Sequence, residues 1–218
     1  MDAALERIAG SYDHWLQRRY VQGKLAADPA YAAVAELVAA RPLPLLDIGC
    51  GMGLLGQYLH VRGVLRGYLG LDNDPRKIEA GQRALRHAGL ERVLRLRLAD
   101  GHAEHPLRGH VALLDVLHYL PRDCQQTLLA NAIAHLAPGG RVIVRTMLRE
   151  RSWRYQLTRV SEFFLRTSGW MRVGAQHYPS AEELRGPMEA AGLRVTLRPL
   201  HGRMPLDCYL IVGERELA

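Results

Sequence analysis

Residues 45–53, LLDIGCGMG, decide the fold of this chain. Apolar residues lead into three alternating glycines, and the run LLGQYL follows at residues 54–59. This order is typical of a buried strand, a tight turn and a helix. Glycines let the backbone turn sharply and approach a ligand that a Cβ atom would block. Asp47 stands inside the strand, and a carboxylate there indicates a ligand with a positive group.

Three later acidic residues each follow a run of apolar residues. Asp72 comes 21 residues after the second glycine of the loop, where an acid can accept both hydroxyls of a ribose. Asp100 follows the third run, where a carboxylate can meet the amino group of adenine, and Asp115 ends the fourth run. Each acid alone suits a helix cap or a solvated turn. Acids at four successive strand ends fit S-adenosylmethionine better than a dinucleotide, so the sequence predicts methyl transfer.

The spacing of apolar runs predicts an α/β architecture. Five strands are predicted at residues 44–48, 66–71, 92–98, 110–115 and 142–144. Helices are predicted over residues 2–40 with a break near 28–29, and over 53–61, 75–87 and 121–136. Strands separated by helices predict a Rossmann-like, doubly wound parallel sheet. Two late strands, near 193–199 and 207–213, have no helix-length spacer between them, so we expect an antiparallel hairpin at one edge.

Five motifs in order resemble those of the class I S-adenosylmethionine-dependent methyltransferases. They are the glycine loop with Asp47, the second-strand end Gly70-Leu71-Asp72, Asp100-Gly101, residues 113–121 (LLDVLHYLP) and the turn at 136–141 (LAPGGR). The resemblance is strong over residues 43–146. It implies a seven-stranded sheet of order 3-2-1-4-5-7-6 with strand seven antiparallel. It also implies that the cofactor is bound by Asp47, Gly49, Cys50, Gly51, Gly53, Asp72, Asn73, Asp100, Gly101 and Asp115.

We expect the chain to form a single methyltransferase domain. Its expected parts are an N-terminal helical cap (1–41), a cofactor-binding core (43–146), a cap insertion (147–179) and a C-terminal helix with a β-hairpin (180–218). A length of 218 residues suits one sizeable core.

Two other functions are weighed against methyl transfer. Residues 51–56 also satisfy the GxGxxG pattern of dinucleotide-binding proteins. However, that pattern starts two residues too late for its strand, and a nicotinamide site gives no reason for Asp100 or Asp115. A non-catalytic protein that binds S-adenosylmethionine is the second alternative, because the motifs describe the cofactor site and not the acceptor site.

Catalytic candidates follow the fourth strand and precede the last helix. His118 is the first candidate for a general base, because it follows a strand end that faces the cofactor. Tyr119 is a candidate for orienting the acceptor. His177 precedes a capping box, SAEE at residues 180–183, and so lies on a loop that can border the acceptor. No metal is expected, because the spacing of Asp100 and the histidines at 102, 105 and 110 fits no established site.

The acceptor pocket is expected outside the sheet. A helix beginning near Ser152 would place Trp153 on one apolar stripe, with Tyr155 nearby, over an aromatic small molecule. From the other side, Tyr12 and Trp15 of the N-terminal segment would close the pocket. Residues 152–158 (SWRYQLT) and 199–205 (PLHGRMP), with 115–119, resemble the methyltransferases of bacterial aryl polyene (xanthomonadin-type) pigment pathways. That resemblance implies an aryl or polyenoyl acceptor, O- or C-methylated, on an acyl carrier protein.

Charge and composition restrict the partners. The formal net charge is +7, and eight arginines lie between residues 141 and 172 against two acids. Such a stretch suits an acidic carrier protein or an anionic membrane surface, although a solvated face without a partner is the commoner case. No nucleic-acid-binding module is recognisable, so nucleic acid is not expected. Three sparse cysteines, no secretory signal and no transmembrane run predict a cytoplasmic protein.

Overall fold

The computed structural model describes residues 2–149, 174–200 and 208–217. The expected helix near Ser152, with Trp153 and Tyr155, lies outside the described residues. Most of residues 199–205 and the arginines at 151, 154, 159, 166 and 172 also lie outside them.

Helices and strands alternate through the middle of the chain, as predicted. The helices are α1 (Ala3–Gly10), α2 (Trp15–Ala27), α3 (Ala30–Ala40), α4 (Leu54–Val61), α5 (Pro75–His87), α6 (Arg122–Ala134) and α8 (Ala181–Ala190), with a short 3₁₀ helix at Leu117–Tyr119. The strands are β1 (Leu45–Ile48), β2 (Tyr68–Asp72), β3 (Leu94–Leu98), β4 (His110–Leu114), β5 (Arg141–Met147), β6 (Arg194–Pro199) and β7 (Cys208–Glu214). Element boundaries differ from the predicted ones by a few residues, chiefly in β5, which is longer at both ends.

The seven strands form one sheet in the order β3-β2-β1-β4-β5-β7-β6. Strands β1 to β5 pair in parallel, whereas β7 is antiparallel to both β5 and β6. The predicted fold class, strand order and terminal hairpin are therefore confirmed. The hairpin does not simply extend the edge, because β7 inserts between β5 and β6.

Helices cover both faces of the sheet. On one face, α1 to α5 pack over side chains such as Leu45 and Tyr68. On the other, α6 and α8 pack over alternate side chains such as Leu46 and Leu113. All four residues of β1 are buried, which explains why its sequence is almost continuously apolar. The one polar residue in this strand, Asp47, is therefore inside the protein rather than on its surface.

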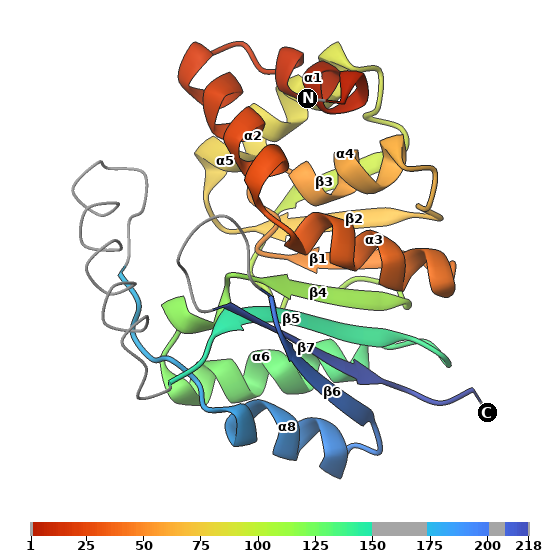
Figure 1. The fold of residues 1–218 in the computed structure, drawn as a ribbon, viewed down its shortest axis with the longest axis vertical. Coiled ribbons are helices and arrows are strands. Elements are labelled where there is room, and N and C mark those ends of the chain that lie inside the picture. Colours follow the sequence, from red (N-terminus) through yellow and green to blue (C-terminus); the bar gives the residue numbers. More distant parts are fainter. Residues whose placement is uncertain (1, 150–173, 201–207, 218) are drawn as a thin grey trace.

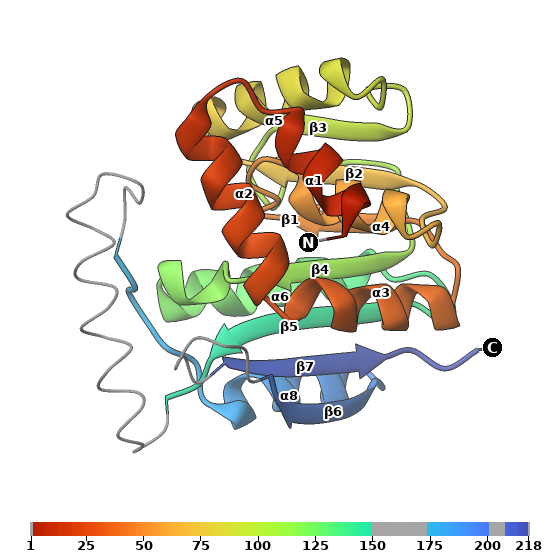
Figure 2. The ribbon, with the colours of Figure 1, turned by 45° about the horizontal axis from the view of Figure 1, so that its top comes forward.

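The carboxyl ends of the parallel strands meet at one edge of the sheet. In Figures 1 and 2 this edge is on the left, where the arrowhead of β5 lies, and the C terminus lies at the opposite edge. Helix α2 runs beside this edge, and an ion pair joins Lys24 in its last turn to Asp115, the residue after β4. In the part of the chain that the structure describes, no helix is long and apolar enough to span a membrane.

Candidate functional site

The glycine loop between β1 and α4 is held in a conformation that requires glycine. Gly49, Gly51 and Gly53 have φ angles of 76°, 58° and 74°, in the left-handed region that favours glycine. The amides of Gly49 and Cys50 donate to the carbonyl oxygen of Leu71 at 2.7 and 3.0 Å, so β2 fixes the start of the loop. The three glycines predicted from the sequence therefore shape one turn at the end of β1.

Gly51 is the glycine with space above it. A Cβ atom built on Gly51 would have no heavy atom within 4 Å, whereas one on Gly49 would lie 2.2 Å from the side chain of Val116. Gly49 is thus required by packing within the protein, and Gly51 leaves a cradle that a side chain would fill. A cradle of backbone groups beside a carboxylate fits the methionine end of S-adenosylmethionine.

The acid at the end of β2 supports the loop directly. One carboxylate oxygen of Asp72 accepts the amide of Gly51 at 2.8 Å, and the other accepts the amide of Asp74 at 2.9 Å. Each carboxylate oxygen has a second lone pair, so both can still accept a hydroxyl. Asn73 beside it is exposed. The structure brings Asp72 and the glycine loop together, as the predicted cofactor site demands.

Asp100 and Gly101 lie beyond the end of β3. The Asp100 carboxylate accepts the amide of His102 at 2.7 Å, and it is exposed. A Cβ atom on Gly101 would lie 2.8 Å from both Ile48 and Leu128, so this turn packs against the end of β1. The two residues thus border the edge that carries the glycine loop. Within the described ranges, no group of three or more metal-binding side chains occurs.

Asp47 is buried and accepts a short hydrogen bond. Its Oδ2 accepts the hydroxyl of Tyr68 at 2.6 Å, and only 3% of the residue is exposed. Burial raises the pKa of Asp47 to about 7, although the Tyr68 hydroxyl favours the charged form. The folded protein therefore holds the Asp47 proton more tightly than the unfolded chain does between pH 4 and 7. Because of this, Asp47 makes folding less favourable as the pH rises through that range.

Asp47→Asn is expected to stabilise the protein more at pH 8 than at pH 4. The amide keeps an acceptor for the Tyr68 hydroxyl but carries no charge to desolvate. The stability gap between variant and wild type should be about 2–4 kcal/mol larger at pH 8 than at pH 4. Urea denaturation of both proteins at the two pH values measures this gap. Equal gaps at pH 4 and pH 8 would mean that Asp47 titrates as an ordinary carboxyl group.

Asp115 belongs to a cluster of four charged side chains. Its carboxylate lies 2.7 Å from Arg145 and 3.4 Å from Lys24, and both of these cations also pair with Asp28, at 2.7 and 2.8 Å. Burial disfavours ionisation of Asp115, but Arg145 and Lys24 outweigh it and lower the pKa of Asp115 below its ordinary value. No sequence motif indicates this cluster, because the residues around Asp28 predict only a break between helices. The cluster fastens α2 to the ends of β4 and β5.

The backbone at Asp115 is strained. Among the described residues, it is the one non-glycine with a positive φ, 59°. Such strain costs about 1–2 kcal/mol and persists only where neighbouring contacts impose it. Here the Asp115 amide donates to the carbonyl of Arg145 at 2.9 Å while the side chain pairs with the same residue. Arg145 thus contacts both the backbone amide and the side chain of Asp115. The sequence predicts Asp115 as a cofactor contact, and the residue lies at the same edge of the sheet as the glycine loop.

Arg145→Met is expected to lower the free energy of unfolding by about 3 kcal/mol. The substitution leaves Asp28, whose side chain is 7% exposed, and Asp115 with Lys24 as their shared cation. In a chain of this size the melting temperature should fall by about 6–12 °C. Arg149→Met is the matched control, since that side chain is 55% exposed and its change should cost less than about 1 kcal/mol. Equal losses in the two variants would contradict a special role for the cluster.

The three catalytic candidates lie close together. His118 accepts the amides of Gln176 and His177 on its carbonyl oxygen, at 2.8 and 3.4 Å, so the loop before α8 sits on the turn after β4. The His118 ring is buried, its Nδ1 lies 3.4 Å from the Thr146 hydroxyl, and its centroid is 4.1 Å from that of Tyr119. The sequence placed His118 beside Tyr119, and the fold adds His177 from almost sixty residues later.

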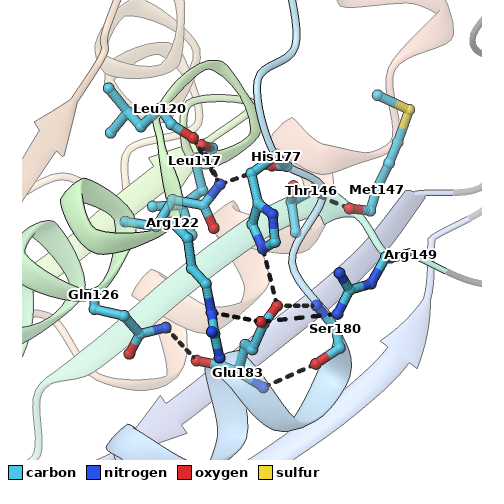
Figure 3. Close-up of polar contacts among 11 residues, drawn as sticks. Leu117, Leu120, Arg122, Gln126, Thr146, Met147, Arg149, His177, Ser180 and Glu183 are labelled. Atoms are coloured by element: carbon cyan, nitrogen blue, oxygen red, sulfur yellow. Dashed lines mark hydrogen bonds and ion pairs between the residues drawn. The ribbon is translucent and has the colours of Figure 1, made fainter.

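His177 forms a hydrogen-bonded pair with Glu183. The His177 Nε2 lies 3.1 Å from the Glu183 carboxylate, and the imidazole donates because an ionised carboxylate only accepts (Figure 3). Glu183 also accepts the amide of Ser180 at 2.8 Å and pairs with Arg122 at 2.8 Å. Burial alone would raise the pKa of Glu183, but the Ser180 amide and His177 lower it. The sequence pattern predicts Glu183 as part of a helix cap. That pattern does not indicate its hydrogen bond to His177.

The predicted pocket residues differ in exposure. Tyr12 is 1% exposed and donates its hydroxyl to the carbonyl of Met52 in the glycine loop at 3.1 Å. Trp15 is 62% exposed at the start of α2. The arginine-rich stretch is also less exposed than expected at its start, because Arg141 and Arg145 are buried in β5 and pair with Glu214 and Asp115. Those two arginines are therefore not part of a basic surface.

Comparisons with known proteins match this chain to methyltransferases. A family model described as a methyltransferase domain matches residues 12–197. A ubiquinone biosynthesis O-methyltransferase of Methylobacterium nodulans is 30% identical over 199 residues, which are 82% of this chain and 77% of that protein.

Two solved structures share the fold. An O-methyltransferase family protein from Burkholderia thailandensis superposes with a TM-score of 0.69 and 21% identity, covering 94% of this chain and 61% of that one. The magnesium protoporphyrin IX methyltransferase from Synechocystis PCC 6803, solved with bound SAH, has a TM-score of 0.68 and 15% identity, with 99% and 95% covered. At these identities the two structures show the fold alone.

Proposed function

We propose that this chain, which belongs to the methyltransferase domain family and is an S-adenosylmethionine-dependent methyltransferase, methylates a hydroxyl oxygen of an apolar, aromatic small molecule. The ubiquinone biosynthesis O-methyltransferase that this chain resembles favours oxygen over carbon as the accepting atom. Because the family is one of methyltransferases, the proposal has S-adenosylmethionine and not a nicotinamide as the cofactor.

We assign the cofactor to the carboxyl ends of β1, β2, β3 and β4. When bound there, S-adenosylmethionine supplies a methyl group activated by a sulfonium centre. The open cradle above Gly51 is proposed to admit the methionine end, and Asp72 to accept the ribose hydroxyls. The other residues proposed to line the cofactor are Asp47, Gly49, Cys50, Gly53, Asn73, Asp100, Gly101 and Asp115.

The observation that carries the acceptor proposal is the pair of His177 and Glu183 beside His118. With Nε2–H donated to Glu183, the other ring nitrogen of His177 has a lone pair that can take a proton. An acceptor hydroxyl would lose its proton to this nitrogen as its oxygen gains the methyl group, and Glu183 would stabilise the imidazolium that results. We assign Tyr119 and His118 to the wall of the acceptor site, where Tyr119 orients the acceptor.

A narrower acceptor is an aryl or polyenoyl group of an aryl polyene pathway, carried on an acidic acyl carrier protein. Its support is the apolar stripe that the sequence predicts to begin at Trp153, with Tyr155 nearby, together with the arginines that follow Met147 in the sequence. Of these arginines, Arg149 is described and is 55% exposed. We further propose one domain over residues 1–218, acting in the cytoplasm, where free cysteines persist.

Label transfer from methyl-labelled S-adenosylmethionine tests this function. The acceptors are phenolic acids, free or loaded on an acyl carrier protein, the same acids without the hydroxyl, RNA and a protein mixture. We expect label on the phenolic acids alone, and NMR of the product should place the methyl group on the phenolic oxygen. Label on the ring carbon, on the acids that lack the hydroxyl, or only on RNA or protein would overturn the proposal. Faster transfer to loaded than to free acids would support the carrier-bound acceptor, and the reverse would contradict it.

A further inference from the structure

The second half of the glycine loop is held by the N-terminal segment. Backbone and side-chain groups of β2 hold Gly49, Cys50 and Gly51, but none of these contacts reaches Met52. The carbonyl oxygen of Met52 instead accepts the hydroxyl of Tyr12 at 3.1 Å, across 40 residues of sequence. The loop is therefore fixed from two separate parts of the chain.

The Tyr12 hydroxyl is itself fixed on both sides. The side-chain amide of Gln57, in the first turn of α4, donates to it at 2.7 Å. Tyr12 is 1% exposed and Gln57 is fully buried, so water does not compete for these bonds. Burial raises the pKa of Tyr12 well above its ordinary value, so the hydroxyl stays protonated and able to donate. A buried donor that bridges a loop carbonyl and a helix side chain fixes the distance between them.

The backbone around Tyr12 is anchored as well. The carbonyl of Tyr12 accepts the Nε of Arg18 at 2.5 Å, and the carbonyl of Ser11 lies 3.1 Å from the ring nitrogen of His87 on α5. From this point α2 continues to Lys24, which pairs with Asp115 at the end of β4. Through Tyr12 the N-terminal segment thus contacts the glycine loop. Through Lys24 it contacts the end of β4, which precedes the catalytic candidates.

We propose that Tyr12 is a positioning residue for S-adenosylmethionine, which holds the Met52 side of the glycine loop in its binding conformation and links that loop to α2. Tyr12 acts through the loop backbone rather than by lining the acceptor pocket. Ligand binding and the ordering of α2 then share one structural element, so each favours the other. This inference rests on the proposed assignment of the cofactor to the glycine loop.

Tyr12→Phe tests the inference, because it removes one hydroxyl and keeps the packed ring. Isothermal titration with S-adenosylhomocysteine should show affinity about 10-fold weaker, equivalent to one net hydrogen bond. The KM for S-adenosylmethionine should rise while kcat at saturation and the acceptor KM stay within about twofold. Tyr58→Phe is the matched control: it also removes one hydroxyl and keeps the ring of a tyrosine that is 6% exposed, next to Gln57 on α4, and it should leave the affinity unchanged.

Hydrogen exchange measures the protection of α2 that the ligand induces, which a change in thermal stability alone would not explain. S-adenosylhomocysteine should slow exchange across α2 in the wild type, and this protection should be smaller in Tyr12→Phe at equal saturation. Unchanged affinity in Tyr12→Phe, or an equal loss in Tyr58→Phe, would overturn the inference. A parallel Gly51→Ala variant distinguishes the proposed role of Tyr12 from the proposed assignment of the cofactor to the glycine loop. If Gly51→Ala loses affinity and Tyr12→Phe does not, only the role of Tyr12 fails; if both keep it, the cofactor assignment fails.

Discussion

Gly51→Ala is expected to weaken the binding of S-adenosylhomocysteine about 100-fold and to abolish measurable methyl transfer, while the protein stays folded. The added methyl group meets no protein atom within 4 Å, so packing alone does not forbid it. It does occupy the space where a ligand would approach the loop backbone. The left-handed φ of 58° adds a strain of about 1–2 kcal/mol. Calorimetry measures the affinity, and circular dichroism with thermal melting measures the fold.

Gly89→Ala is the control for backbone strain. Gly89 follows α5, has a φ of 67°, and a Cβ atom there would also meet nothing within 4 Å. Both variants should therefore lose a similar few degrees of melting temperature, and only Gly51→Ala should lose the ligand. If the two variants bind equally well, the space above Gly51 is not the cofactor cradle. If Gly51→Ala fails to fold while Gly89→Ala folds, the added methyl group disrupts the loop. That outcome would contradict the free space described at Gly51.

His177→Gln is expected to lower kcat about 100-fold and to leave the affinity for S-adenosylhomocysteine unchanged. The substitution removes the nitrogen that takes the acceptor proton but keeps an amide that can contact Glu183. Initial rates with a phenolic acceptor measure kcat, and isothermal titration measures the affinity for S-adenosylhomocysteine.

Glu183→Gln separates catalysis from folding at the same place. Glutamine also serves in a capping box, so the start of α8 should stay intact while the negative charge beside His177 is lost. We expect kcat to fall about 10-fold in this variant, less than in His177→Gln. His118→Asn tests the competing base. If His118→Asn abolishes turnover while His177→Gln retains it, the base is His118 and the assignment to His177 is wrong.

Local sequence sufficed to place the residues proposed for the cofactor at one edge of the sheet. The glycine loop, Asp72 and Asp100 each lie at a strand end, and parallel strands bring their carboxyl ends to one edge whatever the details of packing. The same locality explains why the terminal hairpin was predicted, since two strands without a helix between them pair antiparallel. Local sequence patterns do not predict contacts between distant segments. Nothing around Tyr12 or Asp28 in the sequence indicates a bond to Met52 or to Arg145.

The sequence by itself determined the alternation of strands and helices and, through motifs that resemble those of a known family, the class of reaction and the expected order of the strands, because these depend on short motifs with fixed spacing. Only the tertiary structure decided which distant groups meet. It paired Asp115, which the sequence predicts as a cofactor contact, with Arg145, and it joined His177 to Glu183 and to the turn at His118. The physical reason is that ion pairs and hydrogen bonds depend on distances of a few ångströms, which the folding of whole helices sets and which sequence separation does not record.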